Sequence, residues 1–430
     1  MTAPLIFILV LLFGFLGSSV WVGFSLMSIG ALSLEVFKTI RVDRFMALDF
    51  WSTATAFELV TLPLFILMGE ILFQTKLSEN LFAGLAPWVR RLPGRLTHVN
   101  VLGSTIFAAV SGSSAATTAT VGRITLPELT RMGYNKTFVS GALAGSGTIG
   151  FLIPPSIPLI VYGVLAEVSI LKLFMAGIIP GLILALLFML YIGIRATISP
   201  ELAPAVGDST TMLFKLKSLL KLLPTFLLVL FVVGSMYAGF ASVTEAAAIG
   251  VLGAAILAAF DRRLNISVMA GALMGTIRTC SMIAIILAGA LFLSKAMARL
   301  AIPTDVAAAI AGFELSPMAL ILLLMLFYLV LGCFLDGLST IVMTLPVTLP
   351  LVIAAGFDPI WFGVFLIITI EMAQITPPIG FNLFVIKSIT GQKIGEIALA
   401  ALPFCVIMIA LVLFLTFYPG IVTWLPRSMS

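Results

Sequence analysis

The chain has 430 residues, of which 61% are hydrophobic and only 10% are charged. Soluble domains carry roughly 25% charged residues, so this composition excludes an ordinary soluble globular protein. The formal net charge of +5 comes from Lys and Arg in short segments between apolar runs, which indicates the positive-inside pattern of a membrane protein and no nucleic-acid partner.

Apolar runs of about 18–30 residues recur along the chain, and each is long enough to cross a hydrocarbon core of roughly 30 Å. In chain order they predict helices at 3–36 (one kinked or two short), 54–75, 99–130, 137–165, 169–195, 218–238, 242–260, 266–296, 316–331, 332–353, 359–387 and 395–424. The sequence therefore predicts an all-α polytopic membrane protein embedded in the lipid bilayer.

The polar segment near residue 200 is the best internal boundary and suggests five parts. These are N-terminal scaffold helices (1–98), a first set of transport elements (99–195), a polar linker (196–217), a second group of scaffold helices (218–315), and a second set of transport elements with the final helix (316–430).

Two stretches of the chain match at a constant offset of 223 residues. The matching pairs are Pro154-Pro155 with Pro377-Pro378, Leu126-Pro127 with Leu349-Pro350, Thr125 with Thr348, and Gly133 with Gly356. A single match of this kind is weak evidence, because Leu-Pro and Pro-Pro pairs occur by chance in apolar sequence. Several matches at one constant offset indicate an internal duplication. Interrupted membrane helices in corresponding positions of two halves are typical of a transporter binding site. The repeats could be parallel or inverted, and interrupted hairpins favour inversion.

Each proline pair is expected to break a helix inside the membrane. Proline lacks an N–H and clashes with the carbonyl four residues earlier, so Pro154-Pro155 should free the carbonyls of Gly150 and Phe151. Pro377-Pro378 should free those of residues 373–374. Irregular backbone is tolerated at this depth where it is buried in protein or lines a wet cavity, and freed carbonyls suit Na⁺. A plain kink accommodated by neighbouring helices is the alternative.

A polar cluster precedes each break. SGSSAATTAT, residues 111–120, carries six hydroxyls between two apolar arms that are too short to span separately, which predicts a re-entrant hairpin. The N–H groups that start its second arm offer a carboxylate site. The second tip, LDGLST, contains Asp336, whose charge would be costly at this depth without a cation. Helix packing through small residues is the alternative for the first cluster, and an ordinary interfacial charge is the alternative for Asp336.

Other polar residues in the apolar runs are less specific. Glu58, Glu70, Glu245 and Glu371 could each pair with a basic residue or relay a proton, and Arg123 could meet an anion or extend to the interface. The chain has no GxxxxGK[ST], HExxH or GxSxG motif, so we expect neither ATP hydrolysis nor another enzyme activity. Transport of an anion would then need an ion gradient.

Three segments carry a family resemblance. MGYNKTFVSGALAGSGTIGFLIPPSIPLIVYGVLAEVSI, FLDGLSTIVMTLPVTLPL and EMAQITPPIGFNLFVIKSITG resemble the large membrane subunit of tripartite ATP-independent periplasmic (TRAP) transporters, the DctM-like proteins. The resemblance implies an elevator-type transporter with inverted repeats, two re-entrant hairpins and Na⁺ coupling. It also implies a small four-helix membrane subunit and a periplasmic substrate-binding protein as partners, organic acid substrates such as dicarboxylates, and a bacterial or archaeal inner membrane. Val243 stands where the family usually has proline.

Carried onto this chain, the resemblance gives two tips that face two breaks, with one Na⁺ at each pair and the substrate between them. The expected cation ligands are Ser111, Ser114, Gly147, Gly150, Pro154, Asp336, Gly337, Gln374, Thr376 and Pro377. The expected substrate contacts are Ser111, Ser113, Ser114, Thr117, Gly337, Ser339, Thr340 and Asn382.

Three other functions compete with this hypothesis. A stand-alone sodium–carboxylate symporter would need no partner chain, and co-purification of a four-helix partner would separate the two. An ion channel would need a continuous pore and a much higher conductance. An intramembrane enzyme would need a nucleophile–base pair, which the sequence does not offer.

Overall fold

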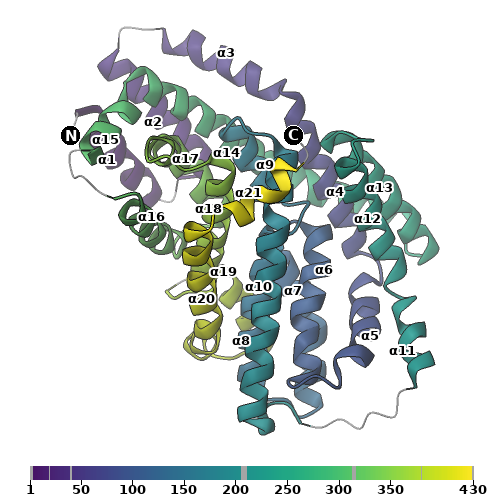
Figure 1. Ribbon diagram of the computed structural model, residues 1–430. Helices are drawn as coiled ribbons and strands as arrows, with labels where there is room; N and C mark the ends of the chain where they lie inside the picture. The colour runs from purple at the N-terminus through teal and green to yellow at the C-terminus, as the bar shows by residue number, and fades with distance from the viewer. Residues whose placement is uncertain are drawn as a thin grey trace.

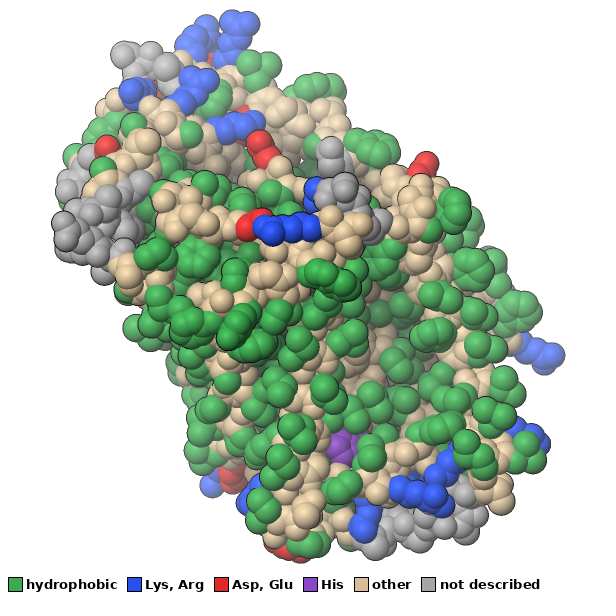
Figure 2. Space-filling model, viewed as in Figure 1, with side chains coloured by type: hydrophobic (Ala, Val, Ile, Leu, Met, Phe, Trp, Pro, Cys, Tyr) green, Lys and Arg blue, Asp and Glu red, His purple; other side chains and the backbone are tan. Residues whose placement is uncertain are grey.

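A computed structural model describes residues 3–18, 20–38, 41–204, 211–311, 316–378 and 380–428. These residues form helices joined by turns and loops, as the composition predicts (Figure 1). Five helices of the described part are long and apolar enough to cross a membrane, and a sixth span results if α11 and α12, bent by 46°, count as one. Figure 2 shows hydrophobic side chains over a broad zone of this face, with Lys and Arg mainly toward its two ends.

One group of helices comes from the beginning and the middle of the chain. Its members are α1 (Ala3–Gly17), α2 (Val22–Phe37), α3 (Val42–Ala54), the 3₁₀ turn η1 (Phe57–Val60), α4 (Thr61–Phe73), α5 (Leu77–Val89), α11 (Met212–Leu219), α12 (Leu223–Tyr237), α13 (Val243–Phe260), α14 (Ile266–Arg299) and α15 (Ile302–Ala311). Helix α14 packs along α2 and α4, and α13 packs against both α4 and α12. Segments from the two halves of the chain therefore pack together around α4 and α14.

The remaining helices form a second group. They are η2 (Arg95–Thr97), α6 (His98–Ser111), α7 (Ser114–Arg131), α8 (Lys136–Gly147), η3 (Thr148–Phe151), α9 (Ile157–Leu165), α10 (Ile170–Ile198), η4 (Pro200–Leu202), α16 (Pro317–Gly332), α17 (Gly337–Ala354), α18 (Pro359–Gln374), α19 (Phe381–Thr390), α20 (Ile394–Phe417) and α21 (Gly420–Arg427). In Figure 1 the yellow C-terminal helices lie beside the blue and teal helices of the first half, and α20 packs on α8 while α10 packs on α18.

The duplication inferred from sequence has a structural counterpart. Helix α7 covers residues 114–131 and α17 covers residues 337–354, so their boundaries are also 223 residues apart. The glycines that follow them, Gly133 and Gly356, both have positive φ angles, of 84° and 87°. Both proline pairs contain a cis peptide bond.

The hydropathy pattern missed several short helices and misplaced several boundaries. The helix expected at 54–75 is divided, because α3 ends at Ala54 and α4 begins only at Thr61 after the η1 turn. Helices α3, α5 and α15 were not predicted, since they are short and α3 and α5 carry charged residues that mask them in a hydropathy scan. Within the range 196–217 predicted as a polar linker, α10 continues to Ile198 and the amphipathic α11 begins at Met212 and packs on α5, while residues 205–210 lie outside the described residues.

Candidate functional site

The first polar cluster forms a tight turn between α6 and α7. Gly112 ends α6 with a φ of 57°, and Ser113 caps α7 by accepting a hydrogen bond from the Ala116 N–H. The Ser111 and Thr117 hydroxyls lie 2.8 Å apart and are hydrogen-bonded. Part of the hydroxyl-rich sequence thus serves the turn itself, because Ser113 satisfies a backbone N–H that the start of α7 would leave unpaired.

The first break lies against this turn. Helix α8 ends at Gly147, and α9 begins only after Pro154-Pro155 with Ser156 as its cap. An ideal Cβ added to Gly150 would lie 3.1 Å from the Ser114 Cα, so glycine allows the backbones to approach closely. One prediction was wrong here. The Phe151 carbonyl is not free, because the Ser156 hydroxyl donates to it at 2.5 Å.

The second turn, between α16 and α17, is built around Asp336. Its carboxylate accepts hydrogen bonds from the backbone N–H groups of Leu338 and Ser339, at 3.1 and 3.2 Å, and caps α17. Asp336 lies at an exposed position rather than buried among protein side chains. The Thr340 hydroxyl donates to the Asp336 carbonyl at 2.9 Å, while the buried Ser339 contributes its N–H to the cap.

Hydrogen bonds connect the second break to the second turn. The Gln374 amide donates to the Leu335 carbonyl at 3.2 Å, and the Cys333 thiol donates to the Pro377 carbonyl at 3.4 Å. The Ala373 carbonyl, predicted to be free, accepts from the Thr376 N–H at 3.1 Å, because the chain makes a tight turn before the prolines. Two of the four carbonyls predicted to be free, those of Phe151 and Ala373, therefore accept hydrogen bonds.

The two repeats meet at Ser114. Asn382, at the start of α19, donates a hydrogen bond from its side chain to the Ser114 hydroxyl at 2.8 Å. The Glu371 carboxylate of α18 lies 2.8 Å from the same hydroxyl. Sequence reasoning placed Asn382 beside the second break, whereas its side chain reaches the first turn. It singled out Glu371 only as one of several membrane carboxyls, although the local signal was visible, since Glu371 is the only charged residue in FGVFLIITIEMAQITPP.

A cavity of about 530 Å³ joins these elements. It is lined by both turns, by residues next to both breaks, and by α4 and α14 from the other group of helices. The predicted site residues that line it are Ser111, Ser113, Ser114, Asp336, Gly337, Gln374 and Asn382. The others, namely Thr117, Gly147, Gly150, Pro154, Ser339, Thr340, Thr376 and Pro377, lie outside its lining.

The ionisable side chains that line this cavity are acidic. Glu70 and Asp336 line it, and no Lys or Arg occurs among the described residues that do. Arg123, considered as an anion contact, is exposed and does not belong to the lining. The hydroxyl and amide groups can donate to an anion, but an anion entering this cavity alone would face carboxylates with no cation to offset them.

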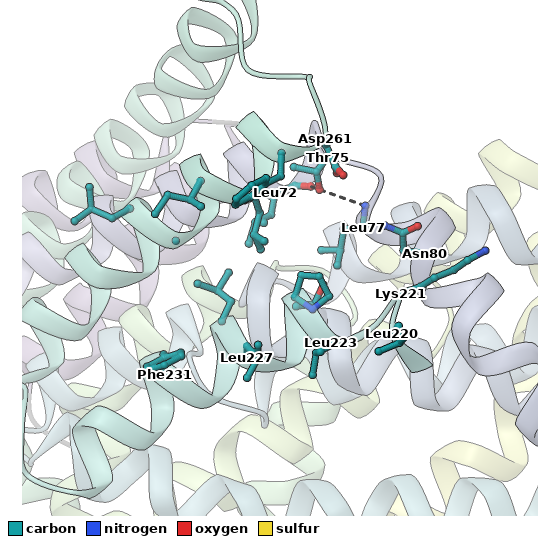
Figure 3. Close-up of a pocket in the computed structure, with 18 of the residues that line it drawn as sticks. Leu72, Thr75, Leu77, Asn80, Leu220, Lys221, Leu223, Leu227, Phe231 and Asp261 are labelled. Atoms are coloured by element: carbon teal, nitrogen blue, oxygen red, sulfur yellow. Dashed lines mark hydrogen bonds between the residues drawn. The ribbon is translucent and has the colours of Figure 1, made fainter. Parts of the chain in front are cut away.

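A second cavity, of about 620 Å³, has a different character. It lies between α4, α5, α12 and α13 and is lined mostly by aliphatic and aromatic side chains (Figure 3). Of its few charged groups, Asp261 accepts a hydrogen bond from the Lys76 N–H at 3.0 Å, and the Lys221 side chain extends away from the apolar residues. This cavity suits hydrocarbon better than an organic anion.

Comparisons with known proteins give the family of the chain. The family described as tripartite ATP-independent periplasmic transporter, DctM component, matches residues 7–421. The chain belongs to this family. It is 33% identical over 402 residues to a C4-dicarboxylate TRAP transporter large permease protein of Pseudomonas aeruginosa, covering 93% of each chain. A sialic acid TRAP transporter large permease protein of Vibrio cholerae is 29% identical, covering 97% of each chain.

A solved structure extends the comparison to the fold. The Alcanivorax borkumensis YdaH transporter superposes with a TM-score of 0.67 at 15% identity, covering 93% of this DctM-family chain and 97% of that chain. At this identity the likeness concerns the fold alone.

Proposed function

We propose that the chain is the membrane-embedded subunit of a sodium-coupled secondary transporter that imports organic acid anions. Membership of the DctM family and the carboxylate-bearing compounds named in its relatives, a C4-dicarboxylate and sialic acid, support this substrate class. The tripartite family supports a small membrane subunit and a periplasmic binding protein as partners, and an inner membrane of a bacterium or archaeon as the location.

The acidic lining of the cavity between the two turns is the observation that carries the proposal of sodium coupling. Its volume of about 530 Å³ lies within the usual range of roughly 300–1,000 Å³ for small-molecule sites. Because its charged lining residues are Glu70 and Asp336, an anion needs cations bound nearby to enter. Co-binding of Na⁺ supplies that positive charge and couples uptake of the anion to the sodium gradient. Each net positive charge that moves inward also gains about 2.3 kcal/mol of free energy per 100 mV of membrane potential.

We further propose that the α6–α7 and α16–α17 pairs are re-entrant hairpins and that transport follows an elevator mechanism. The capped turns that border one cavity, together with the short arm α6 of 14 residues, support the hairpins. The division into two helix groups, with α4 and α14 contributing to the cavity wall, supports movement of one group against the other.

Uptake into proteoliposomes tests the proposal. The chain is reconstituted with its small membrane subunit and binding protein, and uptake of labelled C4-dicarboxylates and sialic acid is measured with an inward Na⁺ gradient or with choline in its place. We expect uptake that requires both Na⁺ and the binding protein. Uptake that requires Na⁺ alone would favour the stand-alone symporter. The transporter proposal is wrong if a ligand-loaded binding protein supports no uptake under any gradient.

A further inference from the structure

The apolar cavity between α4, α5, α12 and α13 shares no lining residue with the polar cavity between the two turns. Its floor is formed by the buried side chains of Leu72, Leu77 and Leu228. Its walls include Leu227 and Leu252, which remain exposed at the surface of the protein. The cavity is therefore an apolar groove that opens on the outside of the helices, and α4 contributes to both cavities.

One end of this groove is polar. Figure 3 shows Asn80, Lys221 and Asp261 toward one side of the cavity and Phe231 at the other. At the polar end α4 and α13 finish, and α5 and α12 begin. The loop after α13 is joined to the loop after α4 by the hydrogen bond from the Lys76 N–H to the Asp261 carboxylate, at 3.0 Å. The polar end therefore lies where these helices leave the apolar layer.

Basic side chains predominate at the polar end. The segments that meet there are residues 74–80, 220–224 and 260–265. Their basic residues, all at exposed positions, are Lys76, Lys221, Arg262 and Arg263. The acidic residues of the same segments are Asp261 and Glu79. An apolar groove with an excess of positive charge at its end complements the chain and the phosphate of an anionic phospholipid.

The length of the groove matches one leaflet of a bilayer. Its lining extends along α12 from Leu223 to Phe231 and along α13 from Ile249 to Phe260. These stretches correspond to roughly 12 and 16 Å at a rise of about 1.5 Å per residue. Half of a hydrocarbon core about 30 Å thick is about 15 Å. A hydrocarbon chain that enters from the polar end therefore reaches the middle of the bilayer within the groove.

The width of the groove decides against a protein helix as its occupant. A volume of about 620 Å³ over a length of about 14 Å gives a mean cross-section of roughly 44 Å². An α-helix with its side chains is about 10–12 Å in diameter, so its cross-section is at least about 80 Å². The groove is too narrow for a helix of a partner subunit, whereas a hydrocarbon chain can enter it.

We propose that this groove binds an anionic phospholipid, with an acyl chain along α12 and α13 and the phosphate beside Lys221. Lipid tails elsewhere in the bilayer are as apolar as the groove, so the chain contributes van der Waals packing and the headgroup contributes the selectivity. The other basic residues of the polar end add to the attraction for an anionic headgroup. This site lies outside the proposed transport site, and its occupancy does not depend on sodium coupling.

Native mass spectrometry of the full chain with its small membrane subunit tests the headgroup assignment. The complex is titrated in detergent with palmitoyl-oleoyl phosphatidylglycerol, or with phosphatidylethanolamine that carries the same chains. We expect phosphatidylglycerol to half-saturate the site at the lower concentration. Lys221→Met should raise that concentration about fivefold, which is the effect of one basic residue near an anionic lipid headgroup, and should leave phosphatidylethanolamine unchanged. Lys172→Met, at an exposed position outside the groove, is the matched control.

A variant that fills the groove tests its location. Leu227→Trp adds bulk to the wall between Leu223 and Phe231 and should remove the saturable binding of phosphatidylglycerol. Leu186→Trp is the matched control, because Leu186 is exposed on α10 and does not line the groove. That variant should bind phosphatidylglycerol as the wild type does.

Three results would overturn the proposal. Equal half-saturating concentrations of the two lipids, in the wild type and in Lys221→Met, would refute an anionic ligand. Saturable phosphatidylglycerol binding that persists in Leu227→Trp would refute the location. Release of the small subunit by Leu227→Trp, with lipid binding retained, would show that a helix of that subunit occupies the groove. Should Leu227→Trp not fold, Lys221→Met carries the test alone. Since no readout requires Na⁺ or uptake, a failure here leaves the proposed transport function standing.

Discussion

The close approach of α8 to α7 makes Gly147 the most informative position for a packing test. Ala at this position would place its Cβ 1.9 Å from the Thr118 Oγ1 atom and 3.2 Å from the Thr118 Cβ. Overpacking of a buried contact costs about 1–3 kcal/mol, and the overlap with a short, fully buried side chain favours the upper end. Because Ala is favoured over Gly in a helix by up to about 1 kcal/mol, we expect Gly147→Ala to destabilise the protein by about 1–2 kcal/mol.

Thermal unfolding in sodium-free detergent buffer measures this effect apart from any cation bound nearby. Gly103→Ala is the matched control, because an added Cβ in α6 would meet its nearest atoms only at 3.8 and 4.0 Å. That variant should keep or slightly raise the melting temperature. The difference between the two variants isolates the contact from the general effect of replacing glycine.

A double-mutant cycle with Thr118→Ala identifies the atom responsible. Thr118→Ala alone removes a hydroxyl without a hydrogen-bond partner in the described structure together with a methyl group, and it should change the melting temperature little. Combined with Gly147→Ala, it should restore most of the lost stability, with a coupling energy of about 1–2 kcal/mol. Additive effects in the cycle would refute the reasoning, since they would show that Gly147 and Thr118 are not in contact.

Three further changes test other parts of the structure. Replacing Pro154-Pro155 or Pro377-Pro378 by Ala-Ala should let the helix continue through the break. We expect the Na⁺ concentration for half-maximal uptake to rise roughly tenfold. Unchanged sodium activation of uptake in both double variants would contradict a role of the breaks in ion binding. Asp336→Asn should leave the melting temperature nearly unchanged, because Asn also caps helices, yet weaken the sodium dependence of uptake, and normal sodium dependence would leave Asp336 as a cap alone. Lys295→Met should lower the free energy of unfolding by about 1–3 kcal/mol, because it leaves the buried Asp49 carboxylate without its ion-pair partner. Adding Asp49→Asn to the same chain should recover much of this loss. A wild-type melting temperature for Lys295→Met would show that the ion pair contributes nothing to stability.

Local signals in the sequence were sufficient for the long apolar helices and for the repeat. Long apolar runs predicted α10, α13, α14 and α20 because a membrane helix must bury its backbone within a single continuous segment. The offset of 223 residues predicted that α7 and α17 would correspond, since turn residues and prolines act on their own neighbours. Helix α3 was not predicted, because charged residues such as Asp49 lower the mean hydropathy of its sequence. Asp49 forms its ion pair with Lys295 of α14 only in the folded protein.

The candidate site shows what the sequence alone could not decide. Hydroxyls near a break predict a polar site, but whether a carbonyl is free depends on partners such as Ser156, which satisfies Phe151. The meeting of Ser114 with Glu371 and Asn382 joins residues more than 250 positions apart. Composition, periodicity and repeats are properties of local chain segments, and so the sequence determined the class, the helices and the duplication. Which oxygens surround one point depends on how α7, α8, α18 and α19 pack, and only the tertiary structure decided that.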